Sequence, residues 1–183
     1  VSGGELHPLA ESLRVFLESG ATLGDALGAV HDAGRVHVDV TPYNILRRGM
    51  TPVLIDFEMA VCVGQFASDL PSLQDYDYVV LTPSCCSPGQ VNRLPVTPAL
   101  DIYCLALTML SWVSGRYGVA RDTTRSNPRR SMSICASGRY PHWDLVTPCI
   151  DAPDGIGLFT RMLEVSPSRR PANGNVFAAL CRG

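Results

Sequence analysis

The strongest constraint on the fold is a change of pattern between residues 36 and 56, where short apolar pieces replace the helical periodicity on either side. Valines alternate with other residues at the start of this segment, and two later apolar pieces flank residues 47–52, which carry the Gly and Pro of a turn. Apolar residues recur at helical spacing in residues 8–30 and again in residues 155–180. Together these patterns predict an α+β fold that is mainly α-helical and carries one short β-hairpin.

The helical stretches contain signals for where each helix ends. Residues 19–22, Ser-Gly-Ala-Thr, interrupt the first stretch and predict two helices, with Thr22 as the N-cap of the second. Gly34 suits the left-handed residue at which this stretch would end. Residues 101–113 are apolar almost all round, which predicts a buried helix. Residues 64–96 lack a sustained period and predict a long surface segment.

Composition excludes several functional classes. The 183 residues are 46% hydrophobic and 17% charged, which is typical of a globular domain rather than a disordered chain. A net charge of −2 gives no general attraction to nucleic acid or to an acidic membrane. The longest apolar stretch, residues 102–113, is shorter than the ~20 residues of a membrane span. All 15 basic residues are Arg, so the chain has no lysine for Schiff-base chemistry or for a Walker-type phosphate site.

The cysteines indicate a compartment. The seven cysteines are scattered and form no Cys-x-x-Cys pair, so a zinc site is not expected. Reduced thiols are typical of an intracellular protein, cytoplasmic or nuclear. The chain starts at Val1 rather than at Met and enters a helical pattern almost at once, which we interpret as the start of a fragment.

Three polar residues surround the predicted hairpin. Asp39 and Asn44 precede it, and Asp56 follows it directly. Carboxylate and amide oxygens brought together from adjacent loops are ligands that suit Mg²⁺, with phosphate oxygens completing its coordination. A further carboxylate held off the metal can orient a hydroxyl nucleophile, which together describes a site for phosphoryl transfer. The alternative is a simple hairpin in which the Asp and Asn side chains only form turns.

The order and spacing of these residues resemble the catalytic half of the protein kinase superfamily. His37-Val38-Asp39 is similar to the His-Arg-Asp triplet, Asn44 to the metal-binding asparagine, and Asp56-Phe57-Glu58 to the Asp-Phe-Gly element. The five residues from Asp39 to Asn44 and the seventeen from Asp39 to Asp56 agree with that family. Three weaker similarities follow in order: Ser87-Pro88-Gly89-Gln90 is similar to the Ala-Pro-Glu element, residues 101–106 to a buried helix of the family, and residues 166–171 to its closing segment. The resemblance as a whole covers residues 9–180.

The resemblance implies a partial kinase domain over residues 1–183, namely the C-terminal lobe with the N-terminal lobe missing. Its expected parts are a catalytic loop at 36–46, a metal-binding Asp-Phe-Glu at 56–58, an activation segment at about 56–90 and the buried helix at about 101–113. Asp39 is expected to be catalytic and to orient the substrate hydroxyl. Asn44 and Asp56 would bind Mg²⁺ and, through it, ATP. His37, Asp101 and Arg170 are expected to give structural support, with Asp101 bonded to the catalytic-loop backbone.

Several positions depart from the family pattern. Val38 replaces an Arg that would bind an activation-loop phosphate, and Thr41 replaces a lysine. Glu58 replaces a glycine and adds negative charge beside the metal site. Gln90 replaces the Glu expected opposite Arg170, so the interaction there is expected to be a hydrogen bond at best and not an ion pair. Phe57 is expected to pack into the core.

The implied function is that of a serine/threonine protein kinase, which transfers the γ-phosphate of ATP to hydroxyls of protein substrates with Mg²⁺. The fragment alone is expected to be inactive without an N-terminal lobe from the same gene product, because the Gly-rich loop and the phosphate-binding lysine are absent from it. The motifs look most like those of herpesvirus-encoded kinases, which would place the protein in the host nucleus. Neither a membrane nor nucleic acid is expected as a partner.

Two alternative functions stay open at this stage. One is a small-molecule phosphotransferase similar to the aminoglycoside and choline kinases, which share a His-x-Asp with an Asn five residues after the Asp. The other is a catalytically inactive pseudokinase lobe that serves interactions, which Glu58, Thr41 and the missing lobe favour.

Overall fold

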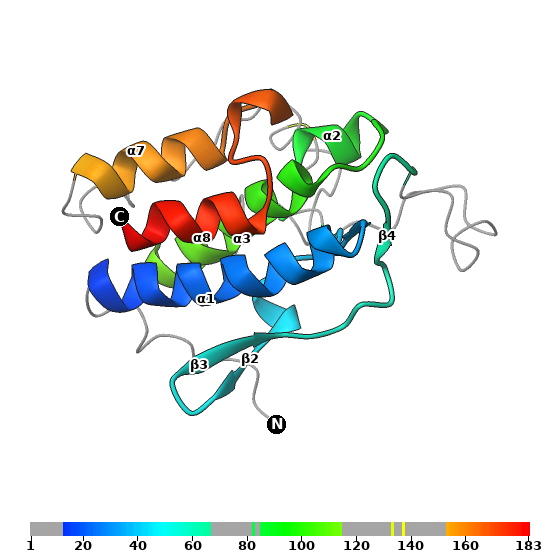
Figure 1. Ribbon diagram of the computed structural model, residues 1–183. Coiled ribbons are helices and arrows are strands. Elements are labelled where there is room, and N and C mark those ends of the chain that lie inside the picture. Colours follow the sequence, from blue (N-terminus) through cyan, green and yellow to red (C-terminus); the bar gives the residue numbers. More distant parts are fainter. Residues whose placement is uncertain (1–12, 67–81, 83–84, 115–132, 134–136, 138–152) are drawn as a thin grey trace.

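The structure is a computed structural model that describes residues 13–66, 82, 85–114, 133, 137 and 153–183 (Figure 1). Its described part is mainly helical, as predicted, and carries two small antiparallel sheets, of which the sequence predicted only the hairpin. The helices are α1 (Leu13–Asp32), α2 (Pro88–Val91), α3 (Pro98–Ser114), α7 (Pro153–Met162) and α8 (Gly174–Arg182), with short 3-10 turns η2 (Pro42–Asn44) and η6 (Pro167–Arg169). The strands are β1 (Arg35–Val36), β2 (Ile45–Arg48), β3 (Thr51–Leu54) and β4 (Val61–Cys62).

The first helix is continuous, so the predicted break at residues 19–22 is wrong. α1 runs without interruption from Leu13 to Asp32, and the Thr22 hydroxyl donates to the Glu18 carbonyl one turn back (2.9 Å) instead of capping a new helix. A Cβ on Gly20 would lie 2.8 Å from Cε of Met109 in α3. The glycine therefore permits close packing of α1 on the core, and this packing outweighs the weak helix propensity of the sequence.

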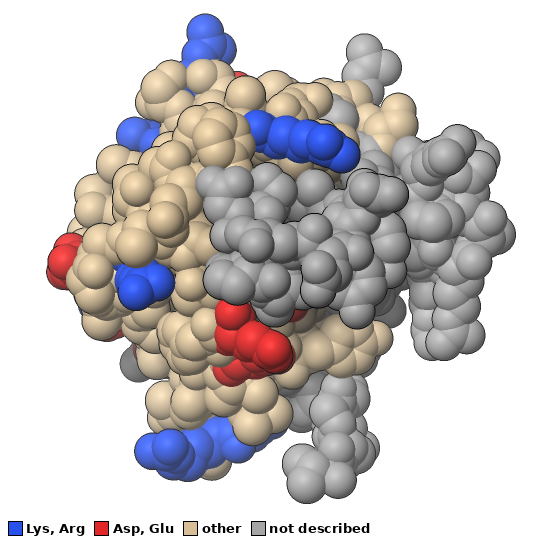
Figure 2. All heavy atoms as spheres, turned by 90° about the vertical axis from the view of Figure 1, so that its right-hand side faces the viewer, with Lys and Arg blue, Asp and Glu red and all other residues tan. Residues whose placement is uncertain are grey.

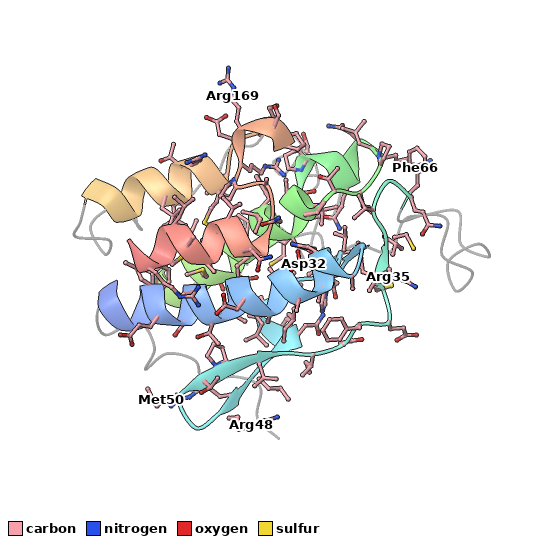
Figure 3. The ribbon with its side chains drawn as sticks, in the orientation of Figure 1. Asp32, Arg35, Arg48, Met50, Phe66 and Arg169 are labelled. Atoms are coloured by element: carbon pink, nitrogen blue, oxygen red, sulfur yellow. The ribbon has the colours of Figure 1, made fainter. Side chains whose placement is uncertain are left out.

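The predicted hairpin is confirmed. β2 pairs antiparallel with β3, with Ile45 opposite Leu54 and Arg48 opposite Thr51. Gly49 takes φ +62° in the connection, a conformation that glycine adopts without strain. Figure 3 shows Arg48 and Met50 at the tip of this hairpin, away from the helices. The second sheet pairs β1 with β4, so the loops that follow β1 and β3 are anchored at both ends.

Helix α3 forms the centre of the core, as the apolar pattern of residues 101–113 predicted. Its residues from Ile102 to Leu110 are buried on every side, including the polar Thr108. The Thr108 hydroxyl donates to the Val40 carbonyl (3.0 Å), which gives this buried group a partner in the loop after β1. Helices α1 and α8 lie side by side across α3 (Figure 1). The buried helix thus supports the loops of the candidate site directly.

Helices α1 and α8 approach each other through small residues. A Cβ on Gly24 would lie 2.9 Å from the Ala178 Cβ, and a side chain on Gly174 would overlap the backbone of Gly24 and Gly28. The left-handed residue predicted at the end of the first stretch is confirmed, because Gly34 has φ +71°. No helix in the described part of the chain combines the length and the apolar character needed to cross a bilayer.

Of the predicted surface segment at 64–96, the structure describes residues 64–66, 82 and 85–96. The carboxyl end of this segment contains the short helix α2, which the sequence did not predict, with Ser87 as N-cap. The Ser87 hydroxyl accepts from the Gln90 N–H, and the Gln90 side chain accepts from the Ser87 N–H, so the two residues form a capping box.

Candidate active site

The loop after β1 contains a residue in a conformation that its type rarely adopts. Val38 has φ +75°, in the left-handed region, although a β-branched side chain disfavours it. Such a residue costs on the order of 1–3 kcal/mol and persists only where its surroundings fix it. Its side chain is buried and belongs to the hydrophobic core. The loop therefore has a defined, strained shape that neighbouring groups must stabilise.

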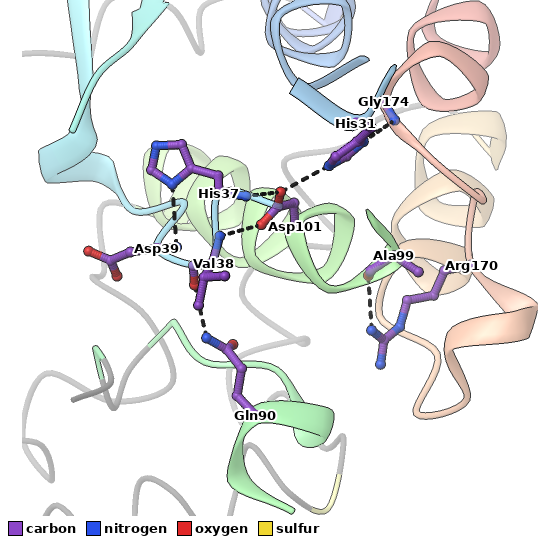
Figure 4. A network of polar contacts seen from close by, with 9 residues as sticks. All are labelled: His31, His37, Val38, Asp39, Gln90, Ala99, Asp101, Arg170 and Gly174. Carbon is purple, nitrogen blue, oxygen red and sulfur yellow. Dashed lines mark hydrogen bonds and ion pairs between the residues drawn. The ribbon is translucent and has the colours of Figure 1, made fainter. Parts of the chain in front are cut away.

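Asp101, at the start of α3, supplies part of this stabilisation. Its carboxylate is fully buried and accepts from the His37 N–H (2.8 Å), from the Val38 N–H (2.9 Å) and from Nε2 of His31 (2.9 Å) (Figure 4). The Gly174 N–H donates to Nδ1 of His31 (3.0 Å), so the proton of this imidazole lies on Nε2 and points at Asp101. A buried carboxylate with three donors is compensated for its lost hydration.

His37 connects the two loops of the site. Its Nε2–H donates to the Ile55 carbonyl at the end of the hairpin (3.0 Å), and its Nδ1 accepts a long hydrogen bond from the Asp39 N–H (3.4 Å). The ring is completely buried. The expectation that Phe57 packs into the core is wrong, because its side chain is 47% exposed. Its ring instead lies against the buried imidazole of His37, with 4.8 Å between ring centroids.

Asp39 is half-buried, and both of its carboxylate oxygens have defined partners. Oδ1 accepts from the Thr82 hydroxyl (2.7 Å), and Oδ2 accepts from the amide nitrogen of Asn44 (2.8 Å). The same amide nitrogen donates to the Asp39 carbonyl (2.9 Å). These bonds fix the direction of the carboxylate, and the sequence predicted the closeness of Asp39 and Asn44 but not the contribution of Thr82.

Asp56 is placed near Asn44 by its chain neighbour Ile55, which is hydrogen-bonded to the Asn44 backbone. The Ile55 N–H donates to the Asn44 carbonyl (2.9 Å), and Asp56 comes next with φ +64°. Its side chain is exposed, whereas that of Asn44 is buried. In the described part of the chain, the hydrogen bonds of the Asn44 side chain are made by its amide nitrogen. An amide oxygen and an exposed carboxylate fit the oxygen-ligand preference of Mg²⁺.

On the face that holds the loop between β3 and β4, carboxylates of the described residues gather in one patch, and the described arginines in this view lie apart from that patch (Figure 2). This loop contains two exposed carboxylates, Asp56 and Glu58. The local charge suits a cation rather than an uncompensated phosphate. Among the described residues, no three or more His, Cys, Asp or Glu side chains are grouped so that they could bind a metal ion by themselves.

Comparison with known proteins identifies the family. Residues 11–180 match the protein kinase domain. The chain belongs to the protein kinase family. It is similar to the serine/threonine-protein kinase PkaA of Streptomyces coelicolor, with 30% identity over 159 residues that cover 80% of this chain and 27% of PkaA. It is also similar to the serine/threonine-protein kinase pkn2 of Myxococcus xanthus, with 29% identity over 161 residues that cover 85% of this chain and 19% of pkn2.

A third relative is the serine/threonine-protein kinase PknK of Mycobacterium tuberculosis, with 29% identity over 160 residues that cover 87% of this chain and 14% of PknK. The chain of this kinase-family protein thus spans about a quarter or less of the length of these relatives. All three named relatives are bacterial serine/threonine kinases.

Gln90, expected to form a hydrogen bond with Arg170 at best, has other partners in this kinase fold, and so has Arg170. The Arg170 guanidinium donates to the carbonyls of Ala99 (3.0 Å), Glu164 (2.6 Å) and Val165 (2.9 Å), and it lies 4.6 Å from the ring centroid of Tyr103. Burial lowers the pKa of Arg170, and the nearby Tyr103 opposes this shift. Arg170 therefore supports the fold by joining the closing segment to the start of α3 (Figure 4).

Sequence reasoning missed His31 and Thr82 as residues of this kinase site. His31 lies in the last turn of α1, and its Nε2–H donates to Asp101, which is seventy positions later in the chain. Thr82 lies in a Ser- and Pro-rich segment that has no regular period. Neither residue has a local pattern that indicates its partner, because both contacts join distant parts of the chain.

Proposed function

We propose that this protein is a serine/threonine protein kinase that transfers the γ-phosphate of ATP to hydroxyls of protein substrates. The observation that carries this proposal is the arrangement of Asp39, whose carboxylate is oriented by Thr82 and Asn44, next to the loop that presents Asp56. Membership of the protein kinase family and the names of the relatives support the same reaction.

In this mechanism, Asp39 accepts the proton of the substrate hydroxyl while its oxygen attacks the γ-phosphorus of ATP, and the bond from that phosphorus to the β,γ-bridging oxygen breaks to release ADP. The bonds from Thr82 and Asn44 hold the carboxylate in one direction, so less of its freedom is lost when substrate binds. Positioning and charge neutralisation supply most of the acceleration in phosphoryl transfer. His37 and Asp101 act only through the backbone that carries Asp39.

The cofactors of the proposed reaction are ATP and Mg²⁺. Asn44, through its amide oxygen, and Asp56, through its carboxylate, would hold the metal and thereby the nucleotide phosphates. The metal would neutralise charge on the transferring phosphoryl group. Because the chain has no lysine, we propose that a separate N-terminal lobe of the same gene product supplies the Gly-rich loop and the lysine that contact the phosphates.

A pseudokinase is the second candidate, and a specific observation favours it. Glu58 is exposed two positions after Asp56, where the family pattern has glycine, and its negative charge adds to that of Asp56 in the same loop. Thr41, at the position of the family lysine, is buried and presents no cation. The small-molecule phosphotransferase alternative receives no support from the family match or from the relatives.

The deciding experiment uses the protein as its gene encodes it, with radiolabelled ATP, Mg²⁺ and a general protein substrate such as casein. We expect incorporation of label on Ser or Thr, and a loss of at least about 100-fold in Asp39→Asn and in Asp56→Asn, since general-base and metal contributions are of this order or larger. Asp32→Asn removes an exposed carboxylate at the end of α1 (Figure 3) and should retain activity.

The outcomes separate the two candidates. Wild-type protein that binds ATP without transferring phosphate, or that binds none, would support the pseudokinase. Transfer that is unchanged in Asp39→Asn would contradict the role given to Asp39.

The remaining parts of the proposal concern branch and location. The motif similarity to herpesvirus-encoded kinases stays a prediction, and the named relatives, which are bacterial, do not support it. We also propose an intracellular location, cytoplasmic or nuclear, and protein substrates as partners besides the N-terminal lobe. Cell fractionation with an antibody to this chain tests the location.

A further inference from the structure

Gln90 joins the end of the activation segment to the catalytic loop. It is the third residue of α2 and is buried, and its amide nitrogen donates to the Val38 carbonyl (2.9 Å) (Figure 4). Its amide oxygen accepts from the Ser87 N–H (2.8 Å) and from the buried Cys104 thiol of α3 (3.5 Å). The side chain is therefore fixed at both ends of its amide, and one end reaches a residue 52 positions away in the sequence.

The contacted carbonyl belongs to the peptide group that leads into Asp39. Val38 has its N–H bonded to Asp101 and its carbonyl bonded to Gln90, and it is the residue with φ +75°. The other polar group of the same peptide unit is the Asp39 N–H, whose hydrogen bond to Nδ1 of His37 is long (3.4 Å). Gln90 consequently supplies the shorter of the two bonds that fix the plane of this peptide group.

We propose that Gln90 is a positioning residue, which orients the Val38–Asp39 peptide so that the Asp39 carboxylate reaches Thr82 and Asn44. The proposal rests on the proposed function, because it assigns a role in the same reaction. If the Val38 carbonyl lost the bond from Gln90, the Val38–Asp39 peptide could rotate, because leaving the left-handed region relieves the backbone strain of Val38. Rotation would turn the Asp39 side chain away from both partners.

The main test is Gln90→Glu in the gene-encoded protein. Glutamate keeps the length of the side chain and the oxygen that accepts from the Ser87 N–H, because Glu also forms capping boxes. Its second oxygen cannot donate to the Val38 carbonyl while the carboxyl group is ionised. We expect kcat to fall by about tenfold at neutral pH, as for a buried acceptor left without a partner, with the KM for ATP little changed.

The pH dependence gives a signature that a purely structural role would not produce. A buried carboxyl group has a raised pKa, so lowering the pH from about 8 to about 6 protonates part of it. The protonated group donates to the Val38 carbonyl again. The ratio of kcat in Gln90→Glu to kcat in the wild type should therefore rise as the pH falls. A ratio that stays low and constant over this range would overturn the proposal.

A second variant keeps the test decisive if Gln90→Glu does not fold. Gln90→Met has a similar shape, no charge and no donor, so it should show the tenfold loss of kcat at every pH without recovery. Wild-type kcat in Gln90→Met would overturn the proposal. Hydrogen exchange should be faster for residues 36–40 in this variant and unchanged for α3, which separates loop release from general unfolding.

Two control variants distinguish a failure of the positioning role of Gln90 from a failure of the proposed kinase function. Ser87→Ala removes the hydroxyl that accepts from the Gln90 N–H (3.3 Å) but leaves the bond from Gln90 to Val38, so its kcat and pH profile should match the wild type within about twofold. Asp39→Asn tests the proposed function itself. If Asp39→Asn is inactive and both Gln90 variants have wild-type kcat, the positioning role fails while the proposed function stands.

Discussion

Replacing Asp101 by Asn tests how the buried carboxylate stabilises the catalytic loop. Asparagine has the same shape but exchanges one carboxylate oxygen for an NH₂ group. Oδ2 of Asp101 accepts from His31 and His37, whereas Oδ1 accepts from Val38. The better orientation of the new amide places its oxygen at the Oδ2 position. Its NH₂ group then faces the Val38 N–H, and two buried donors are left without an acceptor.

The geometry sets the size of the effect. Each buried donor that loses its acceptor costs about 1–3 kcal/mol, so two cost about 2–6 kcal/mol. Removing the buried charge offsets part of this cost, because the neutral amide is less expensive to bury than a carboxylate. We expect a net loss of about 2–3 kcal/mol in the free energy of local opening. His31 cannot compensate by changing tautomer, since its Nδ1 accepts from the Gly174 N–H.

Hydrogen exchange measured by mass spectrometry is the appropriate assay, because it reports opening of a segment separately from global unfolding. In Asp101→Asn, residues 35–40 should exchange about 30- to 150-fold faster, which corresponds to the expected loss. The control Asp32→Asn, in which the new side chain can still accept from the Asn175 amide, should exchange like the wild type. A change of less than about twofold in Asp101→Asn would refute the role of this carboxylate in holding the loop.

Three further predictions concern stability. Gly174→Ala should destabilise the protein by about 1–3 kcal/mol in denaturant unfolding, because its side chain would overlap the backbone of α1, whereas Gly157→Ala in the open part of α7 should be neutral or stabilising. Arg170→Lys should cost about 2–3 kcal/mol, because an ammonium group cannot reach the same three carbonyls, and the exposed Arg169→Lys should stay within about 0.5 kcal/mol of the wild type. Burial raises the pKa of the Cys181 thiol to about 12, so the stability that the neutral thiol contributes is fully present below the ordinary thiol value of 9.0 and decreases as the pH rises from there. The free energy of unfolding should therefore decrease less steeply at alkaline pH in Cys181→Ala than in the wild type, and identical pH profiles of the variant and the wild type would contradict this prediction.

The sequence was sufficient to predict the elements that depend on local patterns. The hairpin, the buried helix that begins near Asp101 and the left-handed Gly34 all follow from apolar spacing and glycine placement, and the structure has each of them. Motif spacing indicated the region in which Asp39, Asn44 and Asp56 lie, and the structure brings the first two into direct contact.

The errors arose where tertiary packing outweighs a local signal. Residues 19–22 have the composition of a helix break, but Gly20 allows α1 to pack closely against Met109, and the helix continues. Gln90 was expected to face Arg170, but each side chain has other partners that come from distant parts of the chain. The left-handed conformation of Val38 had no signal either, since valine is a residue that this region disfavours.

The contacts of Val38 explain how a motif can change while the shape of its loop is kept. Asp101 and Gln90 bond to the N–H and the carbonyl of residue 38, and neither contacts a group that depends on its side-chain type. The family Arg at this position can therefore be replaced by valine as long as the backbone holds φ +75°. Valine then adds core burial, worth about 1.5–3 kcal/mol, which offsets a strain of about 1–3 kcal/mol. The geometry of the loop thus depends on residues 90 and 101 more than on the motif residue itself.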